Sequence, residues 1–566
     1  MQVGLAHEIF FVLLAALIGG LSARLLKLAP IIGYIVGGVI FGGVFGVRGS
    51  QVATLAEIGA ILLLFSTGIE LSLTKLSRVV KIAVFGAIIQ IILVTALVYL
   101  LLLPFGLGGL AGLILAFAFS LSSTAVIVKT LAERGEGETL YGEIMIGWSL
   151  VQDLAIIPVM VLLPVVVSPG GGGILGAAFG ALFKATIVLA ATLFLGKLVA
   201  PYLIRKVSGV NSRELLILSA VTLALGTAAL TSLFGISPIL GAFLAGVVIS
   251  ESQENHAVLA ETRPLRDLFV ALFFVTLGFF VTPGFILPNL FLIVSLAAFV
   301  IIVKFVVVFL ITVLFKYHGR TALPVSLGLA QVGEFAFVIL SYAAILGVVD
   351  EKVTSIGIAV ALVTLLVSPM VYKANLSLWK RIRAFAAHSS LLSKIILGTD
   401  EKTLTGVKEY SNHIIICGYG RVGSWVGKAL ESLQIPFVVV DYNREVTGRL
   451  KSSGVEVIYG DPTEKEIIEA AGVRKAKAIV LAIPDEMAQE EIVAYVQNVN
   501  PKAKLLSRVH RDEDFEKLKI LKVNKLVQPE FEGAISIVRS ILSSMGKSRE
   551  EINQRTKKLR LSHARS

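Results

Sequence analysis

The chain has 566 residues, of which 56% are hydrophobic and 16% are charged, and its formal net charge at pH 7 is +12. Soluble domains of ordinary composition are much less apolar, so we expect most of this chain to lie in a membrane. The positive charge belongs largely to loops between apolar stretches and to the C-terminal stretch "TKKLRLSHARS", so it does not indicate a nucleic-acid partner. The single cysteine, Cys417, excludes an internal disulfide framework and a metal site built from several cysteines.

Apolar stretches close to the bilayer-spanning length of about 20 residues recur along the first two thirds of the chain. Proline, glycine and charged residues separate them. The pattern predicts thirteen crossings, at residues 7–26, 30–47, 54–70, 80–103, 109–131, 144–167, 177–199, 213–234, 236–250, 267–281, 287–315, 322–346 and 353–374. Sequence typical of a soluble domain follows Trp379.

The basic residues predict the orientation of these crossings. Lysine and arginine gather in alternate loops, with Arg48 and Lys352 as exceptions. With an odd number of crossings, we expect a multi-pass protein of the inner (plasma) membrane, its N-terminus outside and its C-terminal domain in the cytoplasm. The first apolar run carries Glu8 and leads to Arg24 rather than to a cleavage site, so it indicates a retained helix and not a signal peptide.

Two crossings are interrupted by polar residues at matching places. If crossings one to six and eight to thirteen form inverted repeats, both interruptions fall in the fifth crossing of their repeat. Such matched breaks predict an ion site near the middle of the membrane. The alternative is that the hydroxyls only bond to carbonyls of their own helix. The residues concerned are Ser120, Ser122, Ser123 and Thr124 in the first break, and Gln331, Gly333 and Glu334 in the second.

Asp153 and Lys304 are charged residues within apolar crossings. A carboxylate in hydrocarbon is costly, so Asp153 indicates a functional site. Lys304 needs a counter-charge, for which Asp153 is the obvious candidate, unless its side chain extends to the membrane surface. Glu334 either lines the ion path or only holds the second break together.

The stretch "HIIICGYGRVGSWVGKALESLQIPFVVVDYNREV" has the pattern of a strand, a glycine turn, a helix and a second strand that ends in an acid. Gly418, Gly420 and Gly423 form the GxGxxG pattern that brings a pyrophosphate to a helix N-terminus, and Asp441 is placed to bind ribose hydroxyls. Arg421 either contacts phosphate or is simply solvated. Strands and helices continue to alternate downstream, which predicts a doubly wound α/β domain. The alternative is a domain of this fold that binds nothing.

The segments "CGYGRVG", "VVVDYN" and "GDPTE" resemble the nucleotide-binding domain called TrkA-N or RCK, over about residues 411–529. The resemblance implies a dimer-forming regulatory module that binds NAD(H) or an adenine nucleotide, rather than a dehydrogenase. By the same resemblance, the nucleotide-binding residues are Gly418, Gly420, Arg421, Gly423, Asp441 and Asp461.

The membrane part resembles the monovalent cation:proton antiporters, specifically their Kef-type branch, over nearly all of the first 375 residues. The motifs that carry the resemblance are "APIIGYIVGGVIFG", "LLLFSTGIELSLTKL", "SLSSTAVIVKTL", "VQDLAIIPVMVLLP", "ISPILGAFLAGVVIS", "LRDLFVALFFVTLGFFV" and "QVGEFAFVIL". It implies a homodimer with inverted repeats and crossed discontinuous helices, similar to NhaA and NapA, in which Asp153 binds the ion. Related sodium antiporters carry two adjacent aspartates where this chain has Gln152 and Asp153. The Kef branch carries the same pair as this chain and is associated with potassium.

These observations predict four regions: an exchanger domain at 1–376, a linker at 377–410, an RCK N-terminal domain at 411–530 and a basic tail at 531–566. We expect an antiporter rather than an enzyme, exchanging potassium for protons. The neutral Gln152 leaves one carboxylate, so electroneutral exchange is expected unless Lys304 also releases a proton. The transport residues are predicted to be Asp153, Gln152, Ser122, Ser123, Thr124, Lys304, Glu334 and Gln331.

Three alternatives remain at this stage. A sodium/proton antiporter would use the same mechanism. A potassium channel gated by its RCK domain is disfavoured because the chain contains no TVGYG-like filter. A membrane oxidoreductase would need a second redox centre, which the single cysteine and seven histidines do not suggest. The short stretch after the nucleotide domain also weakens the expectation of glutathione control.

Overall fold

The computed structural model describes most of both predicted parts of the chain. The described residues are 5–26, 28–45, 53–70, 79–134, 136–137, 139–167, 212–234, 237–250, 254–279, 283–386, 410–483, 486–509 and 518–563, with 180, 183, 202, 204, 206–207, 252, 281, 396 and 515. The chain divides into two compact units. The first consists of Met1–Ala132, Gly137–Phe315 and Ala322–Asn375, and the second of Glu133–Glu136, Lys316–Thr321 and Leu376–Ser566.

The first unit is built from helices that coincide with twelve of the thirteen predicted crossings. The remaining crossing, 177–199, lies outside the described residues apart from two positions. Within the described part, seven helical stretches are long and apolar enough to cross a membrane, which confirms a polytopic helical protein. Its main helices are α1 (Leu5–Leu25), α2 (Pro30–Phe45), α3 (Ala53–Glu70), the π-helix η1 (Ile82–Gly86), α5 (Ala87–Leu102), α6 (Gly109–Ser120), α7 (Thr124–Arg134), α8 (Leu140–Leu154), α9 (Ile156–Val167), α11 (Arg213–Leu233), α12 (Pro238–Ser250), α13 (Asn255–Phe279), α15 (Leu290–Leu314), α16 (Gly319–Gly328), α17 (Phe335–Ile345) and α18 (Glu351–Lys373).

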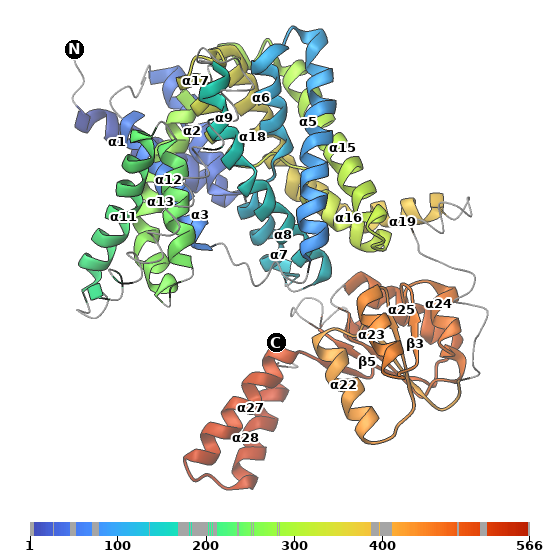
Figure 1. The fold of residues 1–566 in the computed structure, drawn as a ribbon. Coiled ribbons are helices and arrows are strands. Elements are labelled where there is room, and N and C mark those ends of the chain that lie inside the picture. Colours follow the sequence, from blue (N-terminus) through green and yellow to red (C-terminus); the bar gives the residue numbers. More distant parts are fainter. Residues whose placement is uncertain are drawn as a thin grey trace. The chain divides into compact units, whose positions relative to one another are not determined.

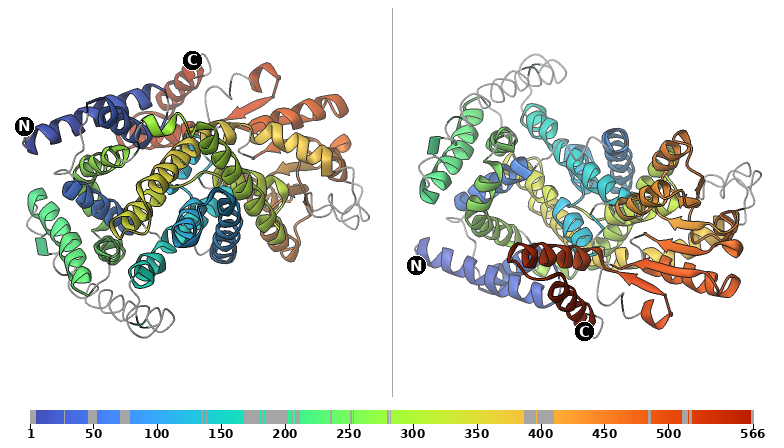
Figure 2. Two further views of the ribbon diagram at one scale, coloured as in Figure 1. Left: turned by 90° about the horizontal axis from the view of Figure 1, so that it is seen from above. Right: turned by 90° about the horizontal axis from the view of Figure 1, so that it is seen from below.

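These helices pack as two groups (Figures 1 and 2). One group contains α1, α2, α3, α11, α12 and α13, in which α3 packs closely against α12 and α13. The other contains α5, α6, α8, α15, α17 and α18, in which α5 packs against α6 and α15. The second group holds both predicted breaks.

The two breaks are real interruptions and are hydrogen-bonded to each other. Helix α6 ends at Ser120, Leu121 is extended (φ −77°, ψ 150°), and α7 begins at Thr124. Helices α16 and α17 are likewise separated by residues 329–334. The amide of Gly333 in one break donates to the carbonyl of Leu121 in the other, over 3.1 Å. The predicted discontinuous helices are therefore confirmed.

Two predicted crossings differ from the helices observed. The crossing predicted at 144–167 is two helices, α8 and α9, that meet at Ala155, two residues after Asp153. The crossing predicted at 267–281 belongs to α13, which begins earlier, at Asn255. Helix α13 continues into polar sequence because Val258 and Leu265 keep an apolar face that packs against α3 and α11.

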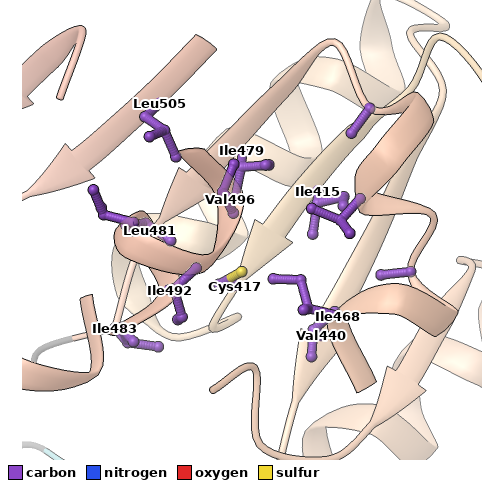
Figure 3. Close-up of a cluster of buried hydrophobic side chains, with 14 of the residues drawn as sticks. Ile415, Cys417, Val440, Ile468, Ile479, Leu481, Ile483, Ile492, Val496 and Leu505 are labelled. Atoms are coloured by element: carbon purple, nitrogen blue, oxygen red, sulfur yellow. The ribbon is translucent and has the colours of Figure 1, made fainter. Parts of the chain in front are cut away.

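The second unit contains a six-stranded parallel sheet in the order β3-β2-β1-β4-β5-β6. This order is typical of doubly wound dinucleotide-binding domains, as predicted. Apolar side chains from the strands and from the flanking helices form its core (Figure 3). The elements are β1 (Ile414–Cys417), α22 (Arg421–Ser432), β2 (Phe437–Asp441), α23 (Arg444–Ser452), β3 (Val457–Tyr459), α24 (Lys465–Ala470), β4 (Ala478–Leu481), α25 (Glu486–Val499), β5 (Lys504–Arg508) and β6 (Lys525–Val527).

The segment predicted as a basic tail forms two helices, α27 (Pro529–Ser544) and α28 (Arg549–His563). Arg560 of α28 donates to Glu532 of α27, which links the two helices. Most of the linker predicted at 377–410 lies outside the described residues, although its beginning belongs to α19 (Asn375–Ala386).

Candidate functional site

Asp153 lies in the last turn of α8 and is only 2% exposed. Its Oδ2 atom accepts a hydrogen bond from the hydroxyl of Thr124 over 2.8 Å. Thr124 is the first residue of α7, so the carboxylate lies at a helix N-terminus, where the helix dipole favours an anion. Among the described residues, the Oδ1 atom of Asp153 is buried and has no hydrogen-bond partner. It is therefore an acceptor available to a proton or a cation.

The serines of the first break are used mainly by the backbone. Ser122 donates from its hydroxyl to the carbonyl of Leu329, which ties the first break to the second over 2.8 Å. The hydroxyl of Ser123 accepts from the amide of Val126 in the first turn of α7. Ser120 donates to a carbonyl of its own helix, α6, as the alternative interpretation expects. In this structure the serine hydroxyls shape the break, and Thr124 is the hydroxyl residue that reaches Asp153.

The second break brings Gln331 and Glu334 to the same region. The side-chain amide of Gln331 donates to the carbonyl of Ser123 over 3.4 Å, while its Oε1 atom is buried and unpartnered within the described part of the chain. Glu334 immediately precedes α17 and is 7% exposed. The carboxylate of Glu334 interacts electrostatically with that of Asp153, so the site contains a second carboxyl group.

Lys304 does not pair with Asp153, contrary to the expectation from sequence. Its ammonium group, in the middle of α15, donates to the carbonyls of Leu121 over 2.7 Å and of Gln331 over 2.6 Å. These carbonyls lie in the two breaks, where helices have ended and backbone acceptors are left unpaired. Lys304 therefore neutralises the negative ends of two half-helices.

Gln152 faces the first break rather than the unpartnered oxygen of Asp153. Its Oε1 atom accepts from the amide of Ser122 over 3.0 Å, and its Nε2 atom donates to the side chain of Gln90. Sequence reasoning missed Gln90, which is fully buried in α5. The signal was present, because an amide in an otherwise apolar membrane helix needs a partner.

In the second unit, the glycine loop between β1 and α22 has the geometry predicted from GxGxxG. Gly418 has φ +89°, a conformation that side chains rarely adopt. A Cβ atom on Gly423 would lie 2.0 Å from the carbonyl oxygen of Gly418, so this position requires glycine for close packing. A Cβ atom on Gly420 would meet nothing within 4 Å. The space over Gly420 at the start of α22 is thus open to a phosphate.

Asp441, at the end of β2, holds this loop in place. Its two carboxylate oxygens accept from the amides of Tyr419 over 2.7 Å and Asn443 over 2.8 Å. Burial raises the pKa of Asp441 above its usual range, although these amide hydrogen bonds oppose the shift. Arg421 is exposed on the first turn of α22. Cys417 is fully buried in the core of the sheet (Figure 3).

Asp461, after β3, is buried and ion-paired in the second unit. It accepts from the amide of Thr463 over 3.0 Å and from the guanidinium of Arg320 over 2.6 Å. Burial alone would raise the pKa of Asp461, but the charges of Arg320 and His318 and the hydrogen bonds from Thr463 and Arg320 together outweigh burial and hold the pKa below its usual range. The nearby Glu464 is 4% exposed, and burial together with the charge of Asp461 raises its pKa to about 8.

Comparison with known proteins identifies relatives of both units. Residues 12–376 match the family described as "Sodium/hydrogen exchanger, transmembrane", and residues 414–529 match the TrkA-N domain. The chain is 32% identical to the putative cation/proton antiporter YbaL of Escherichia coli over 92% of this chain and 94% of that protein. It is 27% identical to the glutathione-regulated potassium-efflux system protein KefC of Salmonella schwarzengrund, over 96% of this chain and 85% of that protein.

A solved structure supports the fold of the first unit. The sodium proton antiporter MjNhaP1 from Methanocaldococcus jannaschii aligns with 65% of this chain and 97% of its own, with a TM-score of 0.52 and 17% identity.

Among the described residues, no group of three or more histidine, cysteine, aspartate or glutamate side chains is arranged to hold a metal ion.

Proposed function

Because the chain belongs to the sodium/hydrogen exchanger family, we propose that it is a secondary antiporter that exchanges potassium for protons, one for one. Membership of this family supports a multi-pass membrane transporter of cations and protons rather than a channel or an oxidoreductase. Potassium is favoured over sodium for two reasons: relatives of similar length are named as potassium-efflux proteins, and Gln152 stands where a second aspartate is found in sodium antiporters.

The proposal depends chiefly on one observation, the buried and unpartnered Oδ1 atom of Asp153. This oxygen binds either a proton or a partly dehydrated cation, and the competition couples the two fluxes. The hydroxyl oxygen of Thr124 and the unpartnered Oε1 atom of Gln331 are the further neutral acceptors for a cation. Alkali cations prefer such oxygen ligands. Ser122 and Ser123 shape the break that presents Thr124, and Glu334 lines the path.

The stoichiometry follows from the charges near the site. The carboxylate of Asp153 carries one negative charge, which is balanced by either one bound proton or one bound cation. Gln152 is neutral, and the one-for-one stoichiometry requires that Lys304, whose ammonium group donates to two backbone carbonyls, and Glu334 keep the same protonation throughout the cycle. A cycle with these charges moves no net charge across the membrane. Purified protein on a solid-supported membrane is therefore expected to give no transport current.

The second unit is proposed to regulate transport by binding NAD(H) or an adenine nucleotide at Gly418, Gly420, Arg421 and Gly423, with Asp441 beside the ribose. Its match to the TrkA-N domain supports a nucleotide ligand. Asp461 was expected at the same site, but its carboxylate forms an ion pair with Arg320 in this structure. Asp461 could bind the nucleotide only if this ion pair opened. We further propose a homodimer with the N-terminus outside and the second unit in the cytoplasm.

The first test is proton movement in proteoliposomes with an imposed pH gradient, to which potassium and then sodium are added. Asp153→Asn should abolish the collapse of the gradient, while the unmutated protein responds to potassium at lower concentration than to sodium. Asp350→Asn is the matched control, because Asp350 caps α18 outside the site and asparagine also caps helices well.

Each result decides a separate part of the proposal. Equal collapse in the unmutated protein and Asp153→Asn would exclude Asp153 as the exchange site. A response to sodium at lower concentration than to potassium would keep the mechanism and replace the substrate. If neither salt collapses the gradient in the presence or absence of added NAD(H) and AMP, the chain is not an exchanger of these cations.

A further inference from the structure

Gln90 is an isolated amide in α5, a helix that is otherwise nearly all apolar, and its side chain has 0% exposure. A buried amide without hydrogen bonds is costly, because neither lipid nor apolar side chains replace its lost water. Both polar atoms of Gln90 are engaged. Its Nε2 atom donates to the carbonyl of Ser120 over 2.9 Å, and its Oε1 atom accepts from Gln152 and from the indole of Trp148.

The two glutamines together complete the hydrogen bonding of the first break. The carbonyl of Ser120 and the amide of Ser122 flank Leu121, where the helical pattern stops and backbone groups lose their partners. Gln90 of α5 pairs with the carbonyl, Gln152 of α8 pairs with the amide, and the two side chains bond to each other. A closed chain of hydrogen bonds therefore joins two neighbouring helices to the break.

The local shape of α5 accommodates this chain of hydrogen bonds. The π-helical turn η1 comes directly before α5, and a Cβ atom on Gly86 in that turn would lie 2.8 Å from the ring of Trp148. Glycine at this position lets the indole approach α5 and donate to Gln90 over 3.4 Å. Single π-helical turns are frequently found at functional sites.

We propose that Gln90 is a positioning residue for cation exchange, acting through Gln152. It orients the amide of Gln152 toward the break and so fixes the extended segment that places Thr124 against Asp153. Both polar atoms of Gln152 are then used, and Gln152 stabilises the break beside the carboxylate of Asp153. A carboxylate at position 152 would have no proton to donate to Gln90, so the amide pair also keeps this position neutral.

The inference rests on the proposed exchange at Asp153, and the test separates the two. Gln90→Leu, Gln152→Leu and the double variant would be reconstituted, and the half-saturating potassium concentration and the pH profile of exchange measured. Gln90→Leu should raise the half-saturating concentration roughly tenfold, as expected for one lost buried hydrogen bond, and shift the pH profile. The double variant should resemble the single ones, because both residues act in one unit.

Thr95→Val is the matched control, since Thr95 is in the same helix and its buried hydroxyl has no partner among the described residues. A purely structural role for Gln90 would lower the yield and the maximal rate but leave the half-saturating concentration and pH profile unchanged, and this result would overturn the inference. Effects of the two single variants that multiply in the double variant would overturn it as well.

If Gln90→Leu does not reach the membrane folded, Gln90→Asn replaces it, because it keeps the amide but shortens its reach. The same direction of change is expected, and an unchanged half-saturating concentration would overturn the inference. Asp153→Asn distinguishes the two levels of failure. Unchanged exchange in Asp153→Asn removes the proposed site itself, whereas loss there with normal Gln90 variants removes only the role of Gln90.

Discussion

Lys304 shows how a buried charge is stabilised without an opposite charge on a side chain. Its ammonium group lies between two backbone carbonyls, at the ends of half-helices whose dipoles converge there. The energetic role of Lys304 is thus to hold the two breaks together. We expect this role to leave Lys304 independent of the protonation of Asp153, as the proposed exchange at Asp153 requires.

Lys304→Met is expected to destabilise the protein by roughly 1–3 kcal/mol, because it removes the side-chain donor to the carbonyl of Gln331 and one of the two donors to the carbonyl of Leu121. The loss should be the same in the unmutated protein and in Asp153→Asn, with coupling below about 0.5 kcal/mol in a double-mutant cycle of thermal stability. Lys352→Met, at an exposed lysine of α18, is the control. A coupling well above that value would show that Lys304 and Asp153 form an ion pair in the membrane.

Glu464 supplies a pH dependence outside the membrane. Burial raises its pKa from 4.5 to about 8, so the folded domain favours the protonated acid. The resulting stability is fully present below about pH 4.5 and is lost as the pH rises through about 8. Glu464→Gln should remove this loss and stabilise the region around α24 at pH 9, by up to about 5 kcal/mol.

The measurement for Glu464 is hydrogen exchange of the α24 amides in the full chain, comparing the variant with the unmutated protein at pH 5 and pH 9. The protection should differ little at pH 5 and be greater in the variant at pH 9. Glu466→Gln provides the control, since Glu466 is exposed on the same helix. Equal protection at both pH values would mean that Glu464 ionises normally.

At the scale of elements, the crossing of the two breaks depends on close backbone contact. A Cβ atom on Gly333 would lie 2.6 Å from the carbonyl carbon and oxygen of Ser122, and 2.8 Å from the nitrogen of Ser123. These are backbone atoms, which cannot move aside as a flexible side chain can. The amide of Gly333 also donates to Leu121, so the contact and the hydrogen bond occur together.

Gly333→Ala is therefore expected to separate the breaks and reduce exchange at least tenfold, with lower thermal stability. Gly226→Ala in α11 is the matched control, because a Cβ atom there meets nothing within 4 Å and alanine favours helix. Reconstituted variants would be compared by proton flux per folded protein. Normal flux in Gly333→Ala would show that the transport site tolerates displacement of the crossing.

The positions of the helices and of their breaks were predictable from the sequence, because they follow from where apolar and polar residues lie along the chain. Apolar length located the helices, and polar residues such as Ser122 and Gln331 marked the breaks. The partners of Lys304 and Gln90 were not predictable, because both bond to backbone groups or side chains at least 27 residues away. Backbone carbonyls at a helix end carry no signature in the amino-acid sequence. Lys304 was consequently paired with the wrong acceptor, and the sequence could not name the partners of Gln90.

At the scale of the whole molecule, regulation requires that nucleotide binding in the second unit favour one transport state of the first. A ligand shifts such an equilibrium only by its difference in affinity for the two states. The effect of nucleotide on potassium affinity and the effect of potassium on nucleotide affinity are consequently reciprocal at equilibrium. Saturating potassium, present at the same concentration on both sides of the membrane, should therefore change the nucleotide affinity by the same factor by which nucleotide changes potassium affinity.

Gly420→Ala separates nucleotide binding from folding of the domain. Gly420 has ordinary backbone angles (φ −76°, ψ −155°), and an added Cβ atom meets no protein atom within 4 Å, so the domain should fold normally. The methyl group would instead occupy the space needed by a phosphate at the start of α22. We expect at least a tenfold loss of affinity for NAD(H) or AMP, and exchange that no longer responds to either.

Gly448→Ala is the control for this prediction, because Gly448 lies in α23 and its added Cβ atom also meets nothing within 4 Å. Calorimetric titration would give the nucleotide affinity, and proteoliposome flux with and without nucleotide would give the response. Loss of binding with an unchanged response of transport would place the regulatory ligand elsewhere in the chain. Retained binding in Gly420→Ala would mean that the ligand does not approach the glycine loop, because a phosphate at the helix N-terminus and a methyl group on Gly420 require the same space.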